Sequence, residues 1–128
     1  MLKIIRKPQP ILVESKREVY SSVTWHVRPD LWRPQTDVYE TGESVVVRIE
    51  IAGIDDEDVE VVVQGNLLLV RGKRLDSSER RAYHQMEISY GKFVVDIELP
   101  VSVLTDGANA EYKDGFLTIT LPKEKLDK

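Results

Sequence analysis

The sequence predicts an all-β fold, an immunoglobulin-like antiparallel β-sandwich, on three observations. Short runs alternate apolar and polar side chains, as in residues 45–51 and 93–99. Turn residues such as Gly65 and Gly91 separate these runs at regular intervals. No run of ten or more residues with helical periodicity lies between them, which disfavours a parallel βαβ arrangement. Many short strands joined by turn residues are typical of a sandwich.

Composition excludes several classes of function. The 128 residues fit one domain, and their net charge of −4 gives no basic face for nucleic acid. The chain has no cysteine, which excludes disulfides and thiolate metal sites and favours a cytoplasmic protein. No apolar run approaches the roughly 18 residues that span a bilayer, so no membrane partner is expected. Residues 1–8 are basic but lack the apolar stretch of a secretory signal.

The elements are expected in the following order. Residues 1–31 mix prolines, charges and poor helix formers, which indicates a flexible N-terminal arm. Residues 32–123 form the domain, and 124–128 a short tail. Residues 55–58 are expected to form a solvated acidic turn and 72–81 a polar loop. Strands are expected at 36–40, 45–51, 59–64, 67–71 and 93–99, with a weaker one at 83–89.

The end of the chain predicts a hairpin over residues 110–122. Asp114-Gly115 supplies the turn, because glycine adopts a positive φ without steric cost. Leu117, Ile119 and Leu121 then alternate with polar or aromatic residues, as in a half-buried strand. Pro122 ends the strand because it has no N–H to donate.

The chain carries no pattern that predicts catalysis, a cofactor or a metal. Its two histidines, His26 and His84, are too few for a zinc site. The acidic run Asp55–Asp58 lacks the spacing of a calcium loop, and the glycines do not form a phosphate-binding loop. The serines lack the context of an activated nucleophile. We therefore expect no catalytic, cofactor-binding or metal-binding residues, and no enzyme.

Five segments in the same order and with matching gaps resemble the α-crystallin domain of small heat-shock proteins. The turn signature is Ala-x-x-x-Asx-Gly-x-Leu, with Ala110, Gly115 and Leu117 as its fixed positions. The other segments run from Trp32 to Glu40, Ile49 to Val59, Asn66 to Gly72, and Tyr83 to Pro100. The resemblance implies a stress-response chaperone: an ATP-independent holdase that binds partly unfolded client proteins and prevents their aggregation.

The resemblance also implies a homodimer made by strand exchange, with a larger oligomer possible. The Tyr83–Ile88 strand of one chain would pair with the Thr36–Glu40 strand of a second chain. Val95 and Ile88 stand where the family usually has arginine, which removes charges that could fix the register of the dimer. The implied interface residues are Trp32, Pro34, Asp37, Tyr39, Tyr83, His84 and Glu87.

A second implied surface is a groove between the 59–64 and 117–121 strands. Family members commonly fill it with a C-terminal Ile-x-Ile/Val motif, which residues 122–128 lack. Near the front, Ile11 and Val13 in an extended, proline-led segment are suited to dock there, or they form an ordinary apolar cluster. The residues expected to line the groove and contact a client or the arm are Val59, Val61, Leu117 and Ile119.

Further apolar residues fall on the strand faces that point away from the core. Either the arm or a neighbouring subunit covers them, or they form a patch that binds unfolding chains. They are Val46, Val62, Leu67, Leu69, Val94 and Phe116. Two other functions stay open: a monomeric co-chaperone or adaptor that binds one folded partner, and a structural assembly protein that coats one particle.

Overall fold

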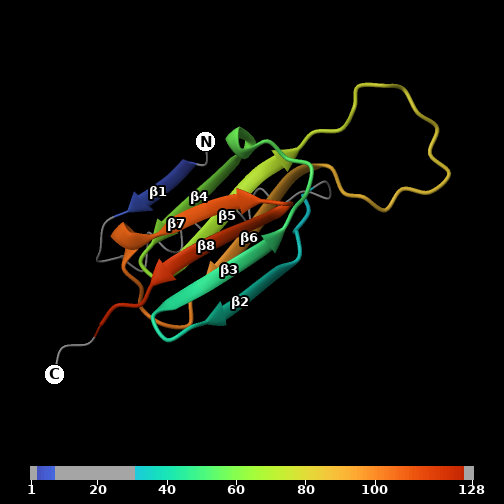
Figure 1. Ribbon diagram of the computed structural model, residues 1–128. Helices are drawn as coiled ribbons and strands as arrows, with labels where there is room; N and C mark the ends of the chain where they lie inside the picture. The colour runs from blue at the N-terminus through green and yellow to red at the C-terminus, as the bar shows by residue number, and fades with distance from the viewer. Residues whose placement is uncertain (1–2, 8–30, 126–128) are drawn as a thin grey trace.

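The alternating runs fold into two four-stranded sheets packed face to face (Figure 1). The structure is a computed structural model that describes residues 3–7 and 31–125. One sheet has the order β1 (Lys3–Lys7), β4 (Val59–Gln64), β5 (Leu67–Arg74), β6 (Gly91–Glu98). The other has the order β2 (Thr36–Glu40), β3 (Ser44–Glu50), β8 (Phe116–Pro122), β7 (Asn109–Lys113). The predicted all-β sandwich is confirmed.

The core lies between the sheets and is built mainly by every second residue of β3, β4, β5, β6 and β8. Val47 on β3 lies opposite Ile119 on β8, and both side chains are fully buried. Val61 on β4 lies opposite Val70 on β5 in the other sheet, and both are also fully buried. Apolar side chains from two inner faces interdigitate in this way in sandwiches generally. The core therefore follows directly from the period-two pattern of the sequence.

Two short 3-10 turns connect strands: η1 (Asp56–Asp58) and η2 (Thr105–Gly107). The Asp55 side chain accepts a hydrogen bond from the backbone N–H of Glu57, which caps η1. The predicted acidic turn is thus a capped helical turn on the surface. No helix within residues 3–7 and 31–125 is long and apolar enough to cross a membrane.

Strand β5 is longer than the alternation predicts. Its last three residues, 72–74, were expected in a polar loop but pair with residues 91–93 of β6. Lys73 and Arg74 are both charged, so the apolar–polar alternation stops before them and does not predict this part of the strand. Backbone pairing does not require apolar side chains where one face meets water.

The strand predicted at residues 83–89 is wrong for the single chain. Residues 75–90 form a loop that projects from one end of the sandwich (Figure 1). The two strands that adjoin the loop in sequence, β5 and β6, pair with each other, and the entry segment forms an isolated bridge from Trp32 to Phe93 on the other side of β6. A strand needs a neighbour to complete its backbone hydrogen bonds, and within this chain the described residues provide none for 83–89.

Strand β1 was not predicted. It lies within the residues expected to form the arm, yet it pairs with β4 in parallel, whereas the other strand pairs of the described part of the chain are antiparallel. Its five residues, Lys-Ile-Ile-Arg-Lys, hold only two adjacent apolar positions, too few to show an alternation.

The apolar residues on the outer strand faces do not form an open patch. Four of them are buried: Val46, Val62, Leu67 and Leu69, with 2–7% of their surface exposed. Val94 and Phe116 are half-buried, and the Arg48 guanidinium lies over the Phe116 ring at 4.3 Å from its centre. The large hydrophobic residues that are exposed lie elsewhere, on β2, on the 75–90 loop and between β6 and β7.

Candidate functional site

The edge of β4 is the first candidate surface, and β1 occupies it. The paired residues run in register from Lys3 opposite Glu60 to Lys7 opposite Gln64. Ile4 lies opposite the fully buried Val61 and packs against the core. Ile5 lies opposite Val62, on the other face of the sheet. Strand β1 therefore occupies the edge of β4 to which an added strand would pair. It lies six to eight residues earlier in the sequence than the segment expected there, which contains Ile11 and Val13.

The residues expected to line the groove belong to the core. Val59, Val61, Leu117 and Ile119 expose 0–3% of their surface. Their contact with a client stays a prediction, and it would require the sandwich or β1 to open. The residues expected to dock there, Ile11 and Val13, lie outside the described residues.

Strand β1 should be held mainly by Ile4. We expect Ile4→Ser to raise hydrogen exchange at the outer-edge amides of β4 about tenfold, because it removes apolar contact worth about 1.5 kcal/mol. Ile5→Ser is the matched control, since Ile5 is adjacent on the same strand but is not packed against the core cluster. Exchange measured by mass spectrometry tests this, and equal effects of the two changes would contradict it.

The turn signature is assembled at the end of the sandwich as predicted. Asp114 and Gly115 both have positive φ, 53° and 84°, which is the backbone of a tight hairpin turn. The Gly115 carbonyl accepts a hydrogen bond from the Ile51 N–H at 2.8 Å, and a Cβ on Gly115 would lie 3.2 Å from the Ala52 Cβ. Ala110 packs against the core cluster from β7. The signature thus encodes packing of the turn onto the end of β3.

Strand β2 is the second candidate surface, because it is an edge strand of its sheet, as β7 is at the opposite side. Among the described residues it pairs only with β3, and four of its five residues are exposed, including Asp37 and Tyr39. Val38 and Tyr39 are each more than 40% exposed. Exposed edges with apolar side chains are surfaces to which another strand can add.

Trp32 and Pro34 belong to the segment that enters β2. The Trp32 indole N–H donates to the Gly91 carbonyl at 3.1 Å, and its ring packs edge-on against Phe93 with 5.6 Å between ring centres. Pro34 is buried. Trp32 therefore fixes the segment that enters β2 on the neighbouring sheet.

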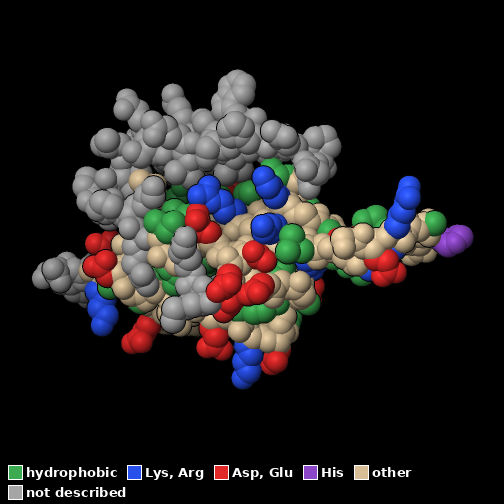
Figure 2. All heavy atoms as spheres, turned by 90° about the horizontal axis from the view of Figure 1, so that it is seen from above, with side chains coloured by type: hydrophobic (Ala, Val, Ile, Leu, Met, Phe, Trp, Pro, Cys, Tyr) green, Lys and Arg blue, Asp and Glu red, His purple; other side chains and the backbone are tan. Residues whose placement is uncertain are grey.

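The 75–90 loop carries the remaining residues of the predicted interface. Tyr83, His84 and Glu87 are all exposed on it. The loop also carries four of the large exposed hydrophobic side chains, Leu75, Tyr83, Met86 and Ile88. Viewed from above, it extends well beyond the sandwich, with hydrophobic and charged side chains along it (Figure 2). Within one chain the structure does not bring this half of the predicted interface to β2.

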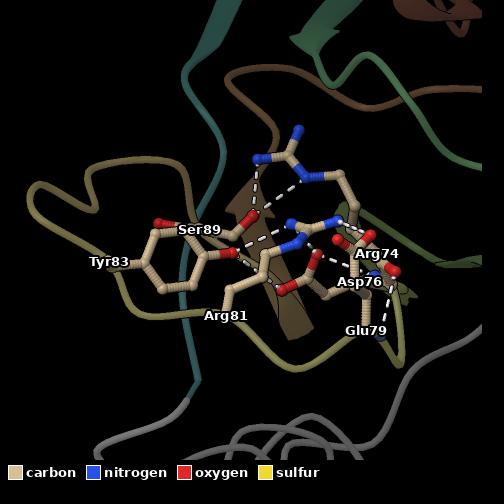
Figure 3. A network of polar contacts seen from close by, with 7 residues as sticks. Arg74, Asp76, Glu79, Arg81, Tyr83 and Ser89 are labelled. Atoms are coloured by element: carbon tan, nitrogen blue, oxygen red, sulfur yellow. Dashed lines mark hydrogen bonds and ion pairs between the residues drawn. The ribbon is translucent and has the colours of Figure 1, made fainter.

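A polar network orders the first half of this loop (Figure 3). Arg81 donates to the Tyr83 hydroxyl at 3.1 Å and forms an ion pair with Asp76 at 3.3 Å. The Tyr83 hydroxyl in turn donates to Asp76 at 3.3 Å, and the Ser77 N–H donates to the same carboxylate at 2.7 Å. The hydrogen bond to Tyr83 and the electrostatic attraction of its oxygen raise the pKa of Arg81 above its ordinary value.

The described residues hold no group of three or more histidine, cysteine, aspartate or glutamate side chains that could bind a metal. His84 lies exposed on the loop and away from the core. The site consists of strand edges and a loop that carries both exposed hydrophobic side chains and charged ones.

Sequence reasoning missed two contributors to this site. Ile4 could have been found only as an apolar residue in a short extended segment, a weak signal. Arg74 stands at the end of β5 and contacts both the loop and the entry segment, yet it looked like one charge in a charged loop.

Comparison with known proteins places the fold in a family. Residues 37–128 match the family model of the Hsp20/alpha crystallin family. Small heat shock protein C2 of Rickettsia felis is 33% identical over 97 residues, which cover 74% of this chain and 63% of that protein. Small heat shock protein C4 of the same organism is 30% identical over 80% of this chain and 64% of its own length. The chain thus spans less than two thirds of these curated relatives.

A solved structure agrees with these matches. A small heat-shock protein from Xylella fastidiosa, described as having a distinct high order structure, superposes with a TM-score of 0.68 at 30% identity. The match covers 76% of this chain and 91% of that one. The family consists of ATP-independent stress chaperones, which agrees with the expectation that the chain is not an enzyme. The chain belongs to the Hsp20/alpha crystallin family of small heat-shock proteins.

Proposed function

We propose that the chain is an ATP-independent holdase that binds partly unfolded proteins and prevents their aggregation under stress. The observation that carries this proposal is the position of its exposed hydrophobic side chains. Six of the eight lie on the β2 edge and the projecting loop, and the other two, Val101 and Leu104, lie between β6 and β7, while the outer faces of the sheets are closed or half-closed. Exposed apolar surface of this kind usually marks an interaction site.

We also propose that these two surfaces join two copies at rest. Residues 83–88 of one chain would add as a strand to the edge of β2 in a second chain, giving them the backbone partner that the described residues of their own chain do not provide. The exposed Val38 and Tyr39 on β2 and Met86 and Ile88 on the loop would be covered together. The high order structure described for the Xylella protein supports self-association in this family.

Self-association and client capture compete for the same apolar surface in this scheme. Heat would shift the population from joined to separated copies, which needs a free-energy change of only a few kcal/mol. Under stress the freed loop and edge would then be available to unfolding chains. Residues expected in the groove would contribute only after β1 leaves β4.

Light scattering of a heated, aggregation-prone protein without ATP tests the proposal. We expect roughly equimolar amounts of this chain to suppress the scattering, because each chain offers one loop and one edge. The test variant is Ile88→Asp in the full chain, since Ile88 is 61% exposed and the change leaves the core untouched. This variant should suppress less while unfolding at the same temperature.

Native mass spectrometry against temperature completes the test. Particles larger than one chain at rest, which shift to smaller species as suppression begins, are the expected result. No suppression even at a large molar excess would contradict the holdase. A strictly monomeric particle that binds one folded protein would instead favour an adaptor, and a particle that never dissociates would favour an assembly protein.

A further inference from the structure

Arg74 joins four segments that are distant in sequence. Its Nε and Nη2 donate to the Ser89 carbonyl at 2.9 and 2.6 Å, and its Nη1 donates to the Ala52 carbonyl at 2.9 Å. Its guanidinium also lies 4.6 Å from the centre of a Trp32 ring and 5.4 Å from that of Tyr90. The side chain is half-buried between these partners. One residue therefore holds the end of β5, the far end of the loop, the entry segment and the β3–β4 turn.

These contacts close the base of the 75–90 loop. Arg74 immediately precedes the loop, and Ser89 and Tyr90 form its last two residues. The hydrogen bonds to Ser89 thus tie the two ends together, and they appear at the loop base in Figure 3. Stacking on Trp32 sets the direction of the base relative to the sandwich. A guanidinium serves here because its planar fork can donate in several directions while stacking on rings.

The loop is also braced inside, by the carboxylate of Asp76 against Arg81 and Tyr83. The Glu79 N–H also donates a hydrogen bond to the Ser77 hydroxyl at 3.0 Å. None of these groups belongs to the sandwich core. They order a segment whose apolar side chains face solvent, a costly arrangement for an idle loop.

We propose that Arg74 is the positioning residue that presents the 75–90 loop, already shaped, to a second copy of this chain. A loop held at both ends and braced inside loses less conformational freedom when it docks, so the complex forms more tightly than with a free loop. The second copy is the fitting partner because its β2 edge, beside the exposed Val38 and Tyr39, has no strand partner among the described residues. The inference rests on the proposed self-association and adds the residue that controls it.

The test is Arg74→Lys in the full chain. Lysine keeps the charge but cannot donate to the Ser89 and Ala52 carbonyls while stacking on Trp32. We expect the dimer dissociation constant, measured by sedimentation at falling concentration, to rise about tenfold or more, as for other losses of preorganisation. Trypsin cleavage after Arg80 and Arg81 should accelerate, because the loop opens at its base. Circular dichroism well below the unfolding temperature should be unchanged.

Arg71→Lys is the matched control. Arg71 lies on the same strand, but its described contacts are an exposed ion pair with Glu60. Its change should leave both the dissociation constant and the loop cleavage within about twofold, as expected for surface ion pairs. Should R74K fail to fold, Asp76→Asn weakens the brace without touching the sandwich, and it should raise the dissociation constant about threefold through the same loss of preorganisation.

Each outcome decides the proposal. Unchanged cleavage and unchanged dissociation in R74K would show that Arg74 does not hold the loop. Faster cleavage with an unchanged dissociation constant would show that the loop does not face a second copy, and the proposal would fall. A holdase that loses no activity in R74K would leave the positioning role intact, while absent suppression in the wild type would refute the proposed function alone.

Discussion

Gly72→Ala is expected to destabilise the domain by about 3 kcal/mol and to lower its Tm by about 10–20 °C. A Cβ at position 72 would lie 2.3 Å from the Asp58 carbonyl oxygen and 2.8 Å from the Phe93 Cζ. The first of these is backbone, which cannot rotate away, so β4 and β5 would have to separate. Thermal unfolding followed by circular dichroism measures the loss.

Gly42→Ala is the matched control for this change. A Cβ at position 42 meets no atom within 4 Å, so the expected change in unfolding free energy is within about 0.5 kcal/mol. Adding Phe93→Leu to Gly72→Ala should not restore stability, because the contact with the Asp58 carbonyl remains. Recovery in that double variant would show that the aromatic ring, and not the backbone, sets the requirement for glycine.

The sandwich could be predicted because its information is local. The alternation in residues 45–51 assigned β3, and the positions facing inward, such as Val47 and Ile49, are fully buried. The turn at Asp114-Gly115 was predictable for the same reason, since positive φ at these positions is a property of the residues themselves. In β8 the burial alternates as the side-chain period predicts, with Leu117, Ile119 and Leu121 buried.

The parts that were missed depend on partners distant in sequence. Lys73 and Arg74 belong to β5 only because β6 extends to Gly91 and pairs with them. Residues 83–89 have a strand-like sequence but no strand partner within residues 3–7 and 31–125. Strand β1 is defined by the edge of β4, and nothing in its five residues alone signals that pairing.

The predicted site also divides into features that local sequence predicts and features that depend on distant partners. Trp32 and Tyr39 were assigned from motif order, and the structure places one on the neighbouring sheet and the other on a free edge. The residues expected in the groove were assigned by strand alternation, which correctly identifies buried positions but cannot tell a groove wall from a core. Val61 and Ile119 are fully buried, so alternation predicted their burial and not their access.

Leu117→Ala distinguishes two roles for this residue of the turn signature: a core position, or a groove wall that contacts clients. Leu117 is fully buried and lies opposite Ile49 on β3 and Tyr112 on β7. Truncation should therefore destabilise the domain by about 3 kcal/mol, through lost burial and a cavity that the strands cannot close. Urea unfolding should show a lower midpoint with an unchanged slope. Thr118→Ala, whose side chain faces away from the core, should cost less than about 1 kcal/mol.

The same variant decides whether Leu117 contacts clients. As a core residue, it should leave suppression of aggregation unchanged at temperatures where the variant is still folded, and reduce it only as the variant unfolds. As a groove residue, it should reduce suppression in the folded range, with Ile119→Ala behaving alike because Ile119 is the next inward position on β8. The sealed packing of both side chains favours the first outcome. Loss of suppression without loss of stability would mean that β1 separates from β4, and the two sheets from each other, when the chain binds a client.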